Sequence, residues 1–229
     1  MKKFLKISKK LFNDETGGCV FCNHIRFLTL YLLIYSNCGI EESTSFISFE
    51  DIFNFYGYKM QKNKPKAYFE ILEAIRLMER NNYFNVISST GIRDEEPSYK
   101  SSIKLKINHD YFFPERNFFE FLFDEMKALL ELSSENNVDF DSLLTIYLYM
   151  RYVFNTTEKK LYFKSSALTA KDIGVSEQAI DRLTKLLTYS TSNYEPLLIV
   201  NKLKSGRTQY KENKGFKKKD MNLPIQRKF

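Results

Sequence analysis

The stretch from Ala167 to Leu187 constrains the fold of this chain more than any other part of the sequence. Apolar residues recur at helical spacing on both sides of Gly174, and this pattern predicts two short helices joined by a tight turn. Glycine suits the turn because it adopts positive φ without a steric penalty. Two short segments follow on either side of Gly206, at residues 197–204 and 208–211. They predict a β-hairpin directly after the second helix.

The packing residues of this stretch resemble those of the bacterial helix-turn-helix motif. Ala170 is small where the second helix must cross, Gly174 follows four residues later at the turn, and Val175 is the apolar residue of the turn. Ile180 and Leu183 are expected to anchor the second helix in the core. With the hairpin added, the order of elements is that of a winged helix, a fold in which the second helix typically reads DNA.

The first half of the chain predicts the same order of elements: a helix, a short strand, two helices and a hairpin. These are expected at residues 23–36, 46–49, 49–57, 65–81, 83–88 and 102–107. In the second half, a helix at 140–154 and a strand at 161–163 precede the two helices of the opening stretch. The sequence therefore predicts two copies of one arrangement, with little sequence identity between them.

We therefore expect a mainly α protein with small β-hairpins, of the α+β class, in which two winged-helix domains are joined by a long helix. The joining helix is predicted from Pro114 to about Ser134, and is interpreted as a bridge between the halves, with a dimer surface as the alternative. The expected division is a basic N-terminal segment (1–22), a first winged helix (23–110), a connecting helix (111–138), a second winged helix (139–215) and a basic tail (216–229).

The helix predicted from Ser176 to Tyr189 carries the residues expected to contact DNA. If its apolar residues are buried, its exposed face holds Ser176, Glu177, Gln178, Asp181, Arg182 and Lys185. Gln178 suits bidentate contact with adenine and Arg182 with guanine. Ser176 is expected to cap the helix and contact phosphate, and Lys185 to meet the DNA backbone. Glu177 and Asp181 argue against DNA unless they accept from cytosine or Asp181 pairs with Lys185.

Basic residues cluster at the ends of the chain and at two local sites. Residues 202–229 hold ten Lys or Arg against two Asp or Glu, and residues 1–12 hold five Lys and no acid. Such clusters suit a polyanion, although a lysine-rich base composition is an alternative explanation. The first twelve residues are expected to form a short helix or an arm, and the tail to be disordered without a partner. Phosphate contacts are expected from the hairpin, at Lys202, Lys204, Arg207 and Lys211, and from a turn in the first half, at Lys59, Lys62, Lys64 and Lys66.

The cysteines and histidines are too few for a complete metal motif. Cys19 and Cys22 are separated by two residues, and Cys38 with His24 or His109 would complete four ligands. A single Cys-x-x-Cys is half of a structural zinc site, so we expect the cysteines to pack as small apolar residues, with no metal or cofactor. We find no catalytic constellation and expect no enzymatic activity. The chain lacks an apolar run long enough to span a bilayer, and three cysteines suit a reducing cytoplasm.

Taken together, the paired arrangement, residues 172–177 and the basic hairpin resemble the replication initiators of bacterial plasmids and the replisome organisers and regulators of phages. The resemblance implies sequence-specific binding of double-stranded DNA, with the principal base contacts in the second winged helix and a dimer contact or second DNA contact in the first. Replication or transcription proteins are further partners that it implies. Two alternatives stay open: a winged-helix module that binds a protein, with its apolar helices forming an oligomer, and a zinc-stabilised domain.

Overall fold

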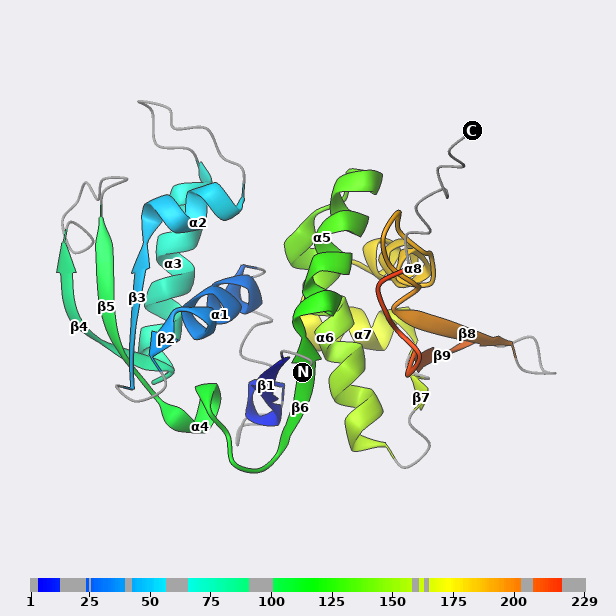
Figure 1. Ribbon diagram of the computed structural model, residues 1–229, viewed down its shortest axis with the longest axis horizontal. Coiled ribbons are helices and arrows are strands. Elements are labelled where there is room, and N and C mark those ends of the chain that lie inside the picture. The colour runs from blue at the N-terminus through cyan, green and yellow to red at the C-terminus, as the bar shows by residue number, and fades with distance from the viewer. Residues whose placement is uncertain are drawn as a thin grey trace, which may run out of the picture. The chain divides into compact units, whose positions relative to one another are not determined.

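The computed structural model describes residues 4–12, 24, 26–39, 43–56, 66–90, 101–157, 161–162, 165–202 and 208–219. Its contacts divide the chain into two compact units. The N-terminal unit comprises Lys6–Phe118, and the C-terminal unit comprises Phe119–Phe229 with Met1–Leu5. Each unit contains helices and a small antiparallel sheet (Figure 1), so the predicted α+β class is confirmed.

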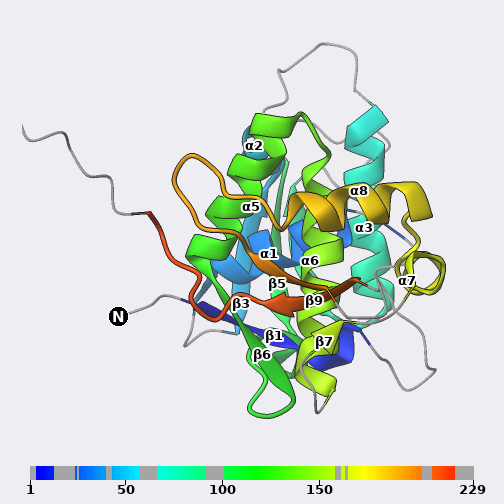
Figure 2. The same ribbon diagram turned by 90° about the vertical axis from the view of Figure 1, so that its right-hand side faces the viewer.

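The N-terminal unit places its helices on one side of a four-stranded sheet. The strands lie in the order β2-β3-β5-β4, so the last strand of the unit is inserted between two earlier ones. Helices α1 and α2 pack on β3 and α3 packs on β4, and Figure 2 shows α1 and α3 in front of the strands. The elements are α1 (Phe27–Ser36), β2 (Cys38–Gly39), β3 (Thr44–Ser48), α2 (Phe49–Phe55), α3 (Lys66–Arg80), β4 (Phe84–Thr90), β5 (Ser102–Ile107) and α4 (His109–Phe112).

Local sequence explains two of these elements directly. Ser48 caps α2 because its hydroxyl accepts a hydrogen bond from the Asp51 N–H at 3.0 Å, which satisfies one of the unpaired donors of the first turn. In β5, Ile103, Leu105 and Ile107 are buried whereas the two intervening lysines are exposed. The local sequence thus accounts for the start of α2 and for the two faces of β5.

The C-terminal unit repeats this order of elements with a three-stranded sheet. A helix, a short strand, two helices and two strands follow one another, and the sheet order β7-β9-β8 again places the last strand in the middle. The elements are β6 (Phe118–Leu122), α5 (Phe123–Asn136), α6 (Phe140–Thr156), β7 (Leu161–Tyr162), α7 (Ser166–Ile173), α8 (Glu177–Leu186), β8 (Leu198–Lys202) and β9 (Thr208–Glu212).

The prediction of a helix beginning at Pro114 was wrong for its first half. Residues 118–122 form β6, in which Phe119 and Phe121 are buried and Glu120 between them is exposed. Only Phe123–Asn136 is helical. The helix begins there because Glu125 folds back to accept a hydrogen bond from the Leu122 N–H at 2.7 Å, as in a capping box.

The basic N-terminal segment is also different from the prediction. Phe4–Ser8 form a strand, β1, followed by a short 3-10 turn at Lys9–Leu11, where a short helix or a free arm was expected. β1 and β6 form a two-stranded sheet. Ile7, Leu11 and Phe12 are buried, so these apolar residues belong to a core and the lysines between them are on the surface side of the strand and turn.

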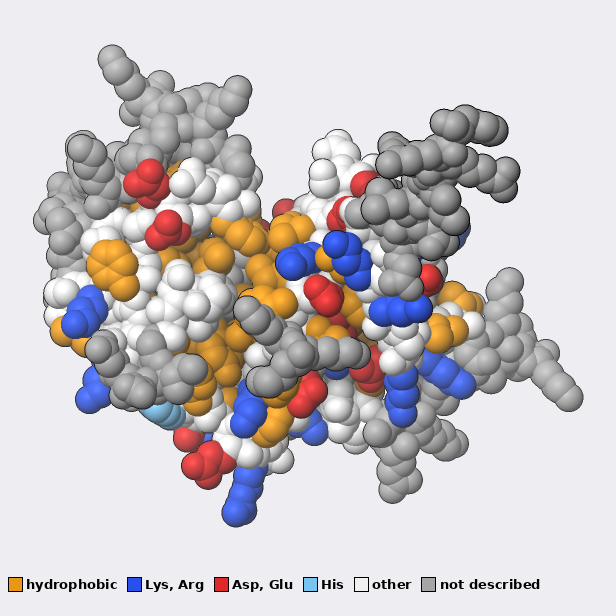
Figure 3. Space-filling view, in the orientation of Figure 1, with side chains coloured by type: hydrophobic (Ala, Val, Ile, Leu, Met, Phe, Trp, Pro, Cys, Tyr) orange, Lys and Arg blue, Asp and Glu red, His pale blue; other side chains and the backbone are white. Residues whose placement is uncertain are grey.

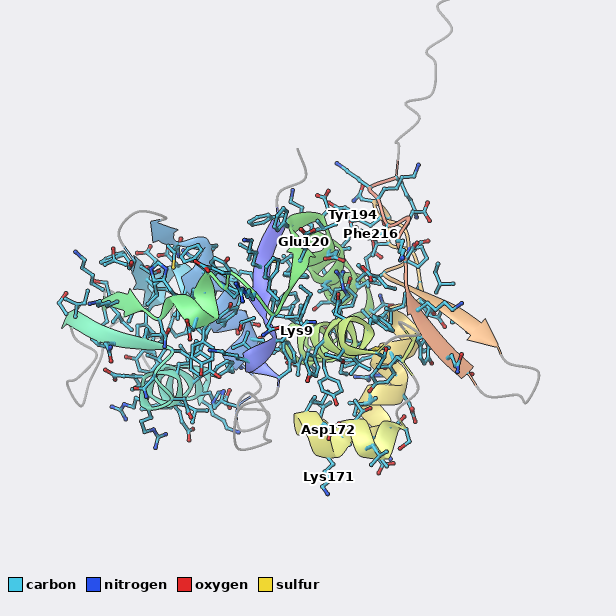
Figure 4. The ribbon with its side chains drawn as sticks, turned by 90° about the horizontal axis from the view of Figure 1, so that it is seen from below. Lys9, Glu120, Lys171, Asp172, Tyr194 and Phe216 are labelled. Carbon is cyan, nitrogen blue, oxygen red and sulfur yellow. The ribbon has the colours of Figure 1, made fainter. Side chains whose placement is uncertain are left out.

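Part of the predicted disordered tail belongs to the fold. Phe216 is buried and its ring stacks on Tyr194, with ring centroids 6.0 Å apart; Figure 4 shows the two labelled rings close together. The Lys219 N–H donates to the Asn193 carbonyl at 2.7 Å and the Glu195 N–H donates to the Lys217 carbonyl at 3.1 Å. The prediction was wrong up to Lys219, and residues 220–229 lie outside the described part of the chain.

Across the described residues, we find no helix that is both long and apolar enough to cross a membrane.

Candidate nucleic-acid interface

The turn between α7 and α8 has the geometry that its sequence predicts. Gly174 has φ 68°, in the left-handed region that residues with a side chain rarely adopt. Its N–H donates to the Ala170 carbonyl at 2.9 Å and so closes α7. Val175 is buried, and the Ser176 hydroxyl accepts from the Ala179 N–H at 3.3 Å to cap α8. α7 therefore ends at Gly174 and α8 begins directly after Ser176.

Helix α8 divides into the two faces that its periodicity predicts. Ile180, Leu183, Leu186 and Leu187 are buried, and α8 packs on α6 and α7. The exposed positions are Ser176, Glu177, Gln178, Asp181, Arg182 and Lys185.

Three of these exposed residues form a polar stripe, which we call the α8 stripe: Gln178, Arg182 and Lys185. Their spacing of four and then three residues places them one above another on the same helix face. Within the described part of the chain, none of their side chains takes part in a hydrogen bond or an ion pair. The stripe thus presents an amide, a guanidinium and an ammonium group to an outside partner.

The acidic residue beside the stripe is used inside the unit. The Ser166 hydroxyl of α7 donates a hydrogen bond to the Asp181 carboxylate, so the alternative pairing of Asp181 with Lys185 was wrong. Burial, together with the nearby Asp181 charge, raises the pKa of the Tyr210 phenol on β9. Asp181 therefore serves the contact of α8 with its neighbours, and Glu177 is the acidic residue that stays exposed at the start of the helix.

Of the basic residues predicted on the hairpin, one has a described side chain. Lys211 is exposed on β9, and it follows Tyr210, so strand alternation places it on the opposite face of the sheet. Its cross-strand neighbour on β8 is Ile199. Lys211 is therefore not part of the α8 stripe. Lys202 is the last residue of β8, and its side chain is not among those described. Lys204 and Arg207 lie outside the described residues.

The segment after α8 is held by two glutamates of α5 that the sequence analysis missed. Glu135 accepts from the Ser192 N–H at 3.1 Å and from its hydroxyl at 2.6 Å. Glu131 accepts from the Thr191 hydroxyl and the Asn193 side-chain amide. On the other side, the Tyr149 hydroxyl of α6 donates to Asp172 of α7; in Figure 4, Lys171 points away from the fold and Asp172 lies between α7 and α6. These contacts hold the region of the α7–α8 turn against α6 and the segment after α8 against α5.

A buried ionic cluster ties the sheet of this unit to its helices. The Arg151 guanidinium of α6 pairs with Glu125 of α5 and with Glu212 of β9, the latter at 3.2 Å. The Tyr147 hydroxyl also donates to Glu125, at 2.6 Å. Burial raises the pKa of the Glu125 carboxyl, and the adjacent Arg151 charge opposes that effect. The three charged side chains, Glu125, Arg151 and Glu212, line a cavity of about 160 Å³. The sequence did not predict this ionic cluster, because Glu125, Arg151 and Glu212 are far apart in the chain.

The basic turn predicted in the N-terminal unit is described at one residue. Lys66 is the first residue of α3 and is exposed, with its ammonium group 3.7 Å from the Glu70 carboxylate. Lys59, Lys62 and Lys64 lie outside the described residues. The structure therefore tests none of the phosphate contacts predicted for this turn.

Three of the candidate metal ligands have described positions. His24 accepts a hydrogen bond from the Arg26 N–H at 3.4 Å, and the His109 ring lies 2.5 Å from the Ser43 hydroxyl. The third is Cys38. Its thiol donates to the Ile34 carbonyl at 3.2 Å, and burial raises its pKa to about 11. Cys19 and Cys22 lie outside the described residues. In the part of the chain that is described, no group of three or more His, Cys, Asp or Glu side chains is arranged to hold a metal.

We expect Cys38 to react slowly with a thiol reagent in the folded protein. The thiolate is the reactive form, and a pKa near 11 lowers the thiolate fraction at about pH 8 roughly a hundredfold relative to an unperturbed thiol. Because a more basic thiolate is also the better nucleophile, about a tenfold loss of rate is left. The measurement follows disulfide exchange with a chromogenic reagent in a Cys19→Ser/Cys22→Ser variant, with and without denaturant. Equal rates in the two conditions would show that the fold does not protect Cys38.

Comparison of the chain with protein family models found no match. Comparisons with curated proteins and with solved structures found none either.

Proposed function

We propose that both units are winged helices and that the chain binds double-stranded DNA sequence-specifically, as a replication initiator or transcriptional regulator of a plasmid, phage or other mobile element in a bacterial cytoplasm. In this proposal α8 enters the major groove, Gln178 and Arg182 contact base edges, and Lys185 contacts a phosphate. The basic residues of the β8–β9 hairpin and of the turn before α3 add phosphate contacts.

The observation that carries the proposal is the α8 stripe. An exposed arginine and an exposed glutamine, one helical turn apart, offer the two bidentate hydrogen-bonding groups that distinguish guanine and adenine. Four contacts support α8 under these two side chains. They are the left-handed turn at Gly174, the Ser176 cap, and the hydrogen bonds of Asp172 and Asp181 to neighbouring helices. Rigid placement matters because bidentate contacts tolerate little misalignment.

The proposal predicts that selection from a random duplex library will enrich one motif. Replacing Arg182 or Gln178 by Ala should weaken binding to that motif by about 1–3 kcal/mol each and relax preference at one base pair, since each substitution removes one bidentate contact. Lys185→Ala should weaken binding to all duplexes alike. It should also lower the slope of log affinity against log salt by about 1, because one phosphate contact is lost. Affinities are measured by fluorescence anisotropy at several salt concentrations.

Lys127→Ala is the matched control, because Lys127 is an exposed lysine of α5 in the same unit. It should leave both affinity and sequence preference unchanged. The proposal fails if no motif is enriched, or if random and selected duplexes bind equally and the stripe variants change neither.

A protein-binding module is a second candidate, because apolar residues are also exposed on this unit. Leu168 on α7, Tyr189 after α8, and Ile199 and Val200 on β8 are all substantially accessible. This function predicts weak DNA binding with little salt dependence, and an oligomeric state or captured partner that changes when Leu168 is replaced by Ser. A motif from the library selection would exclude it as the main function.

A further inference from the structure

The N-terminal unit carries a second polar surface that the α8 stripe does not involve. One face of its sheet is covered by α1, α2 and α3, and receives the buried side chains of β3 and β5. The opposite face, which we call the outer sheet face, carries Phe46 on β3 with 57% of its area exposed. Lys104 and Lys106 of β5 are exposed on the same face. Figure 3 shows blue and orange side chains at the left edge of the molecule, over these strands.

The register of the strands arranges these side chains in two rows. Phe46 of β3 and Ser88 of β4 both lie opposite Lys104, and Thr44 and Asn85 both lie opposite Lys106. Cross-strand neighbours are about 5 Å apart. The Phe46 ring therefore lies in the same row as Lys104, and Lys106 lies in the neighbouring row. The described strands β3, β4 and β5 contain no acidic residue. Ile87, at the bulge of β4 beside Ser88, is also 53% exposed. The exposed side chains of these strands therefore include a ring, two positive charges, small hydrogen-bonding groups and one aliphatic group.

We propose that the outer sheet face binds single-stranded nucleic acid. A base would stack on Phe46, and Lys104 and Lys106 would contact its phosphates, with Ser88 and Asn85 available as hydrogen-bonding partners. Stacking on an exposed ring requires an unpaired base with an open face, which a duplex does not offer. The face is also formed by three adjacent strands, which makes it wider than the single helix or two-stranded ribbon that the major groove admits. This inference is independent of α8, which belongs to the other unit.

Charge selects the polyanion over a second copy of the chain. A twofold contact between two outer sheet faces would bring the lysine pair of β5 against its own equivalent, and like charges that face each other are destabilising. Phosphates are the complementary partner, because each one that a lysine neutralises releases a counterion.

The test titrates the full-length protein into a labelled oligothymidylate of about 15 nucleotides and the matching oligouridylate. Phe46→Val should weaken binding about tenfold, because it keeps the strand propensity and removes the stacking ring. Phe46→Tyr should bind like the wild type. Lys104→Ala/Lys106→Ala should lower the slope of log affinity against log salt by about 1.4, at about 0.7 for each phosphate contact on a single strand. Preference for one oligonucleotide over the other tells DNA from RNA as the ligand.

Phe69→Val is the matched control, because Phe69 lies on α3 and is 54% exposed. It should leave single-strand binding unchanged, and Arg182→Ala should do so too, whereas the outer-face variants should leave duplex binding unchanged. Thermal unfolding of each variant must match that of the wild type. The proposal is overturned if Phe46→Val binds single strands as well as the wild type does. It is also overturned if Phe69→Val loses as much, or if the face binds anionic vesicles and no oligonucleotide.

Discussion

Replacing Arg151 by Ala is expected to lower the free energy of unfolding by about 3–5 kcal/mol, because it leaves the buried Glu125 carboxylate without its main counter-charge. The side chains of Arg151 and Glu125 are only 7% and 4% exposed. The guanidinium also donates to the Glu120 carbonyl at 2.8 Å and to the Tyr147 hydroxyl at 3.1 Å. Its loss therefore removes the link between β6, α5, α6 and β9 in one step. Chemical denaturation followed by circular dichroism gives the change.

A double-mutant cycle separates the ion pair from simple packing. The cycle compares Glu125→Leu, Arg151→Met and the double variant. The double variant removes both charges and keeps apolar volume, so its loss of unfolding free energy should be smaller than the sum of the losses of the two single variants. Arg182→Ala is the matched control, since that arginine is exposed on α8 in the same unit, and it should change stability by no more than about 0.5 kcal/mol. An Arg151→Ala variant as stable as Arg182→Ala would mean that the cluster contributes nothing to the fold.

The features of the C-terminal unit that the sequence predicted are local ones. The positive φ of Gly174 and the cap at Ser176 depend on residues within one helical turn. The two faces of α8 follow from the 3.6-residue period of its apolar positions. The exposed positions of the α8 stripe were predictable for the same reason, although their contact with DNA stays a prediction.

The failures concern elements whose state depends on distant partners. The run Phe118–Leu122 is apolar enough for either a helix or a strand, and a short run leaves the period ambiguous. It is a strand because β1 provides a hydrogen-bonding edge from the other end of the sequence. The N-terminal segment that forms β1 was predicted to be a short helix or an arm because of its lysines. Its apolar residues Ile7 and Leu11 are buried, and they were the sign of a core position.

The supporting contacts of the candidate interface were hidden for the same physical reason. For Asp181 the sequence offered two alternatives, a contact with cytosine or a pair with Lys185 on its own helix, and in the structure it accepts from Ser166 of α7. Glu131 holds Asn193 across a separation of 62 residues. A sequence pattern reports neighbours at three or four positions and does not report which helices will pack together.

Replacing Phe216 by Ala is expected to destabilise the protein by about 3 kcal/mol, the usual cost of removing a buried phenyl ring. Phe216 is 7% exposed, lies nearly parallel to the Tyr194 ring, and borders the cavity beside Arg151. The substitution enlarges that cavity and removes the stack that holds residues 214–219 against the segment after α8. Equilibrium unfolding in denaturant measures the loss, and Phe216→Leu should recover part of it because it refills the site with apolar volume.

Lys217→Ala is the control that distinguishes the loss of the buried Phe216 ring from a general effect of changing the basic segment. Lys217 is exposed, and its contribution to the fold is a backbone carbonyl, which alanine keeps. The variant should therefore unfold within about 0.5 kcal/mol of the wild type. Its duplex affinity should fall only if the segment reaches phosphate. If Phe216→Ala is as stable as Lys217→Ala, the segment is not part of the core and the original expectation of a free basic tail would hold for all of residues 216–229.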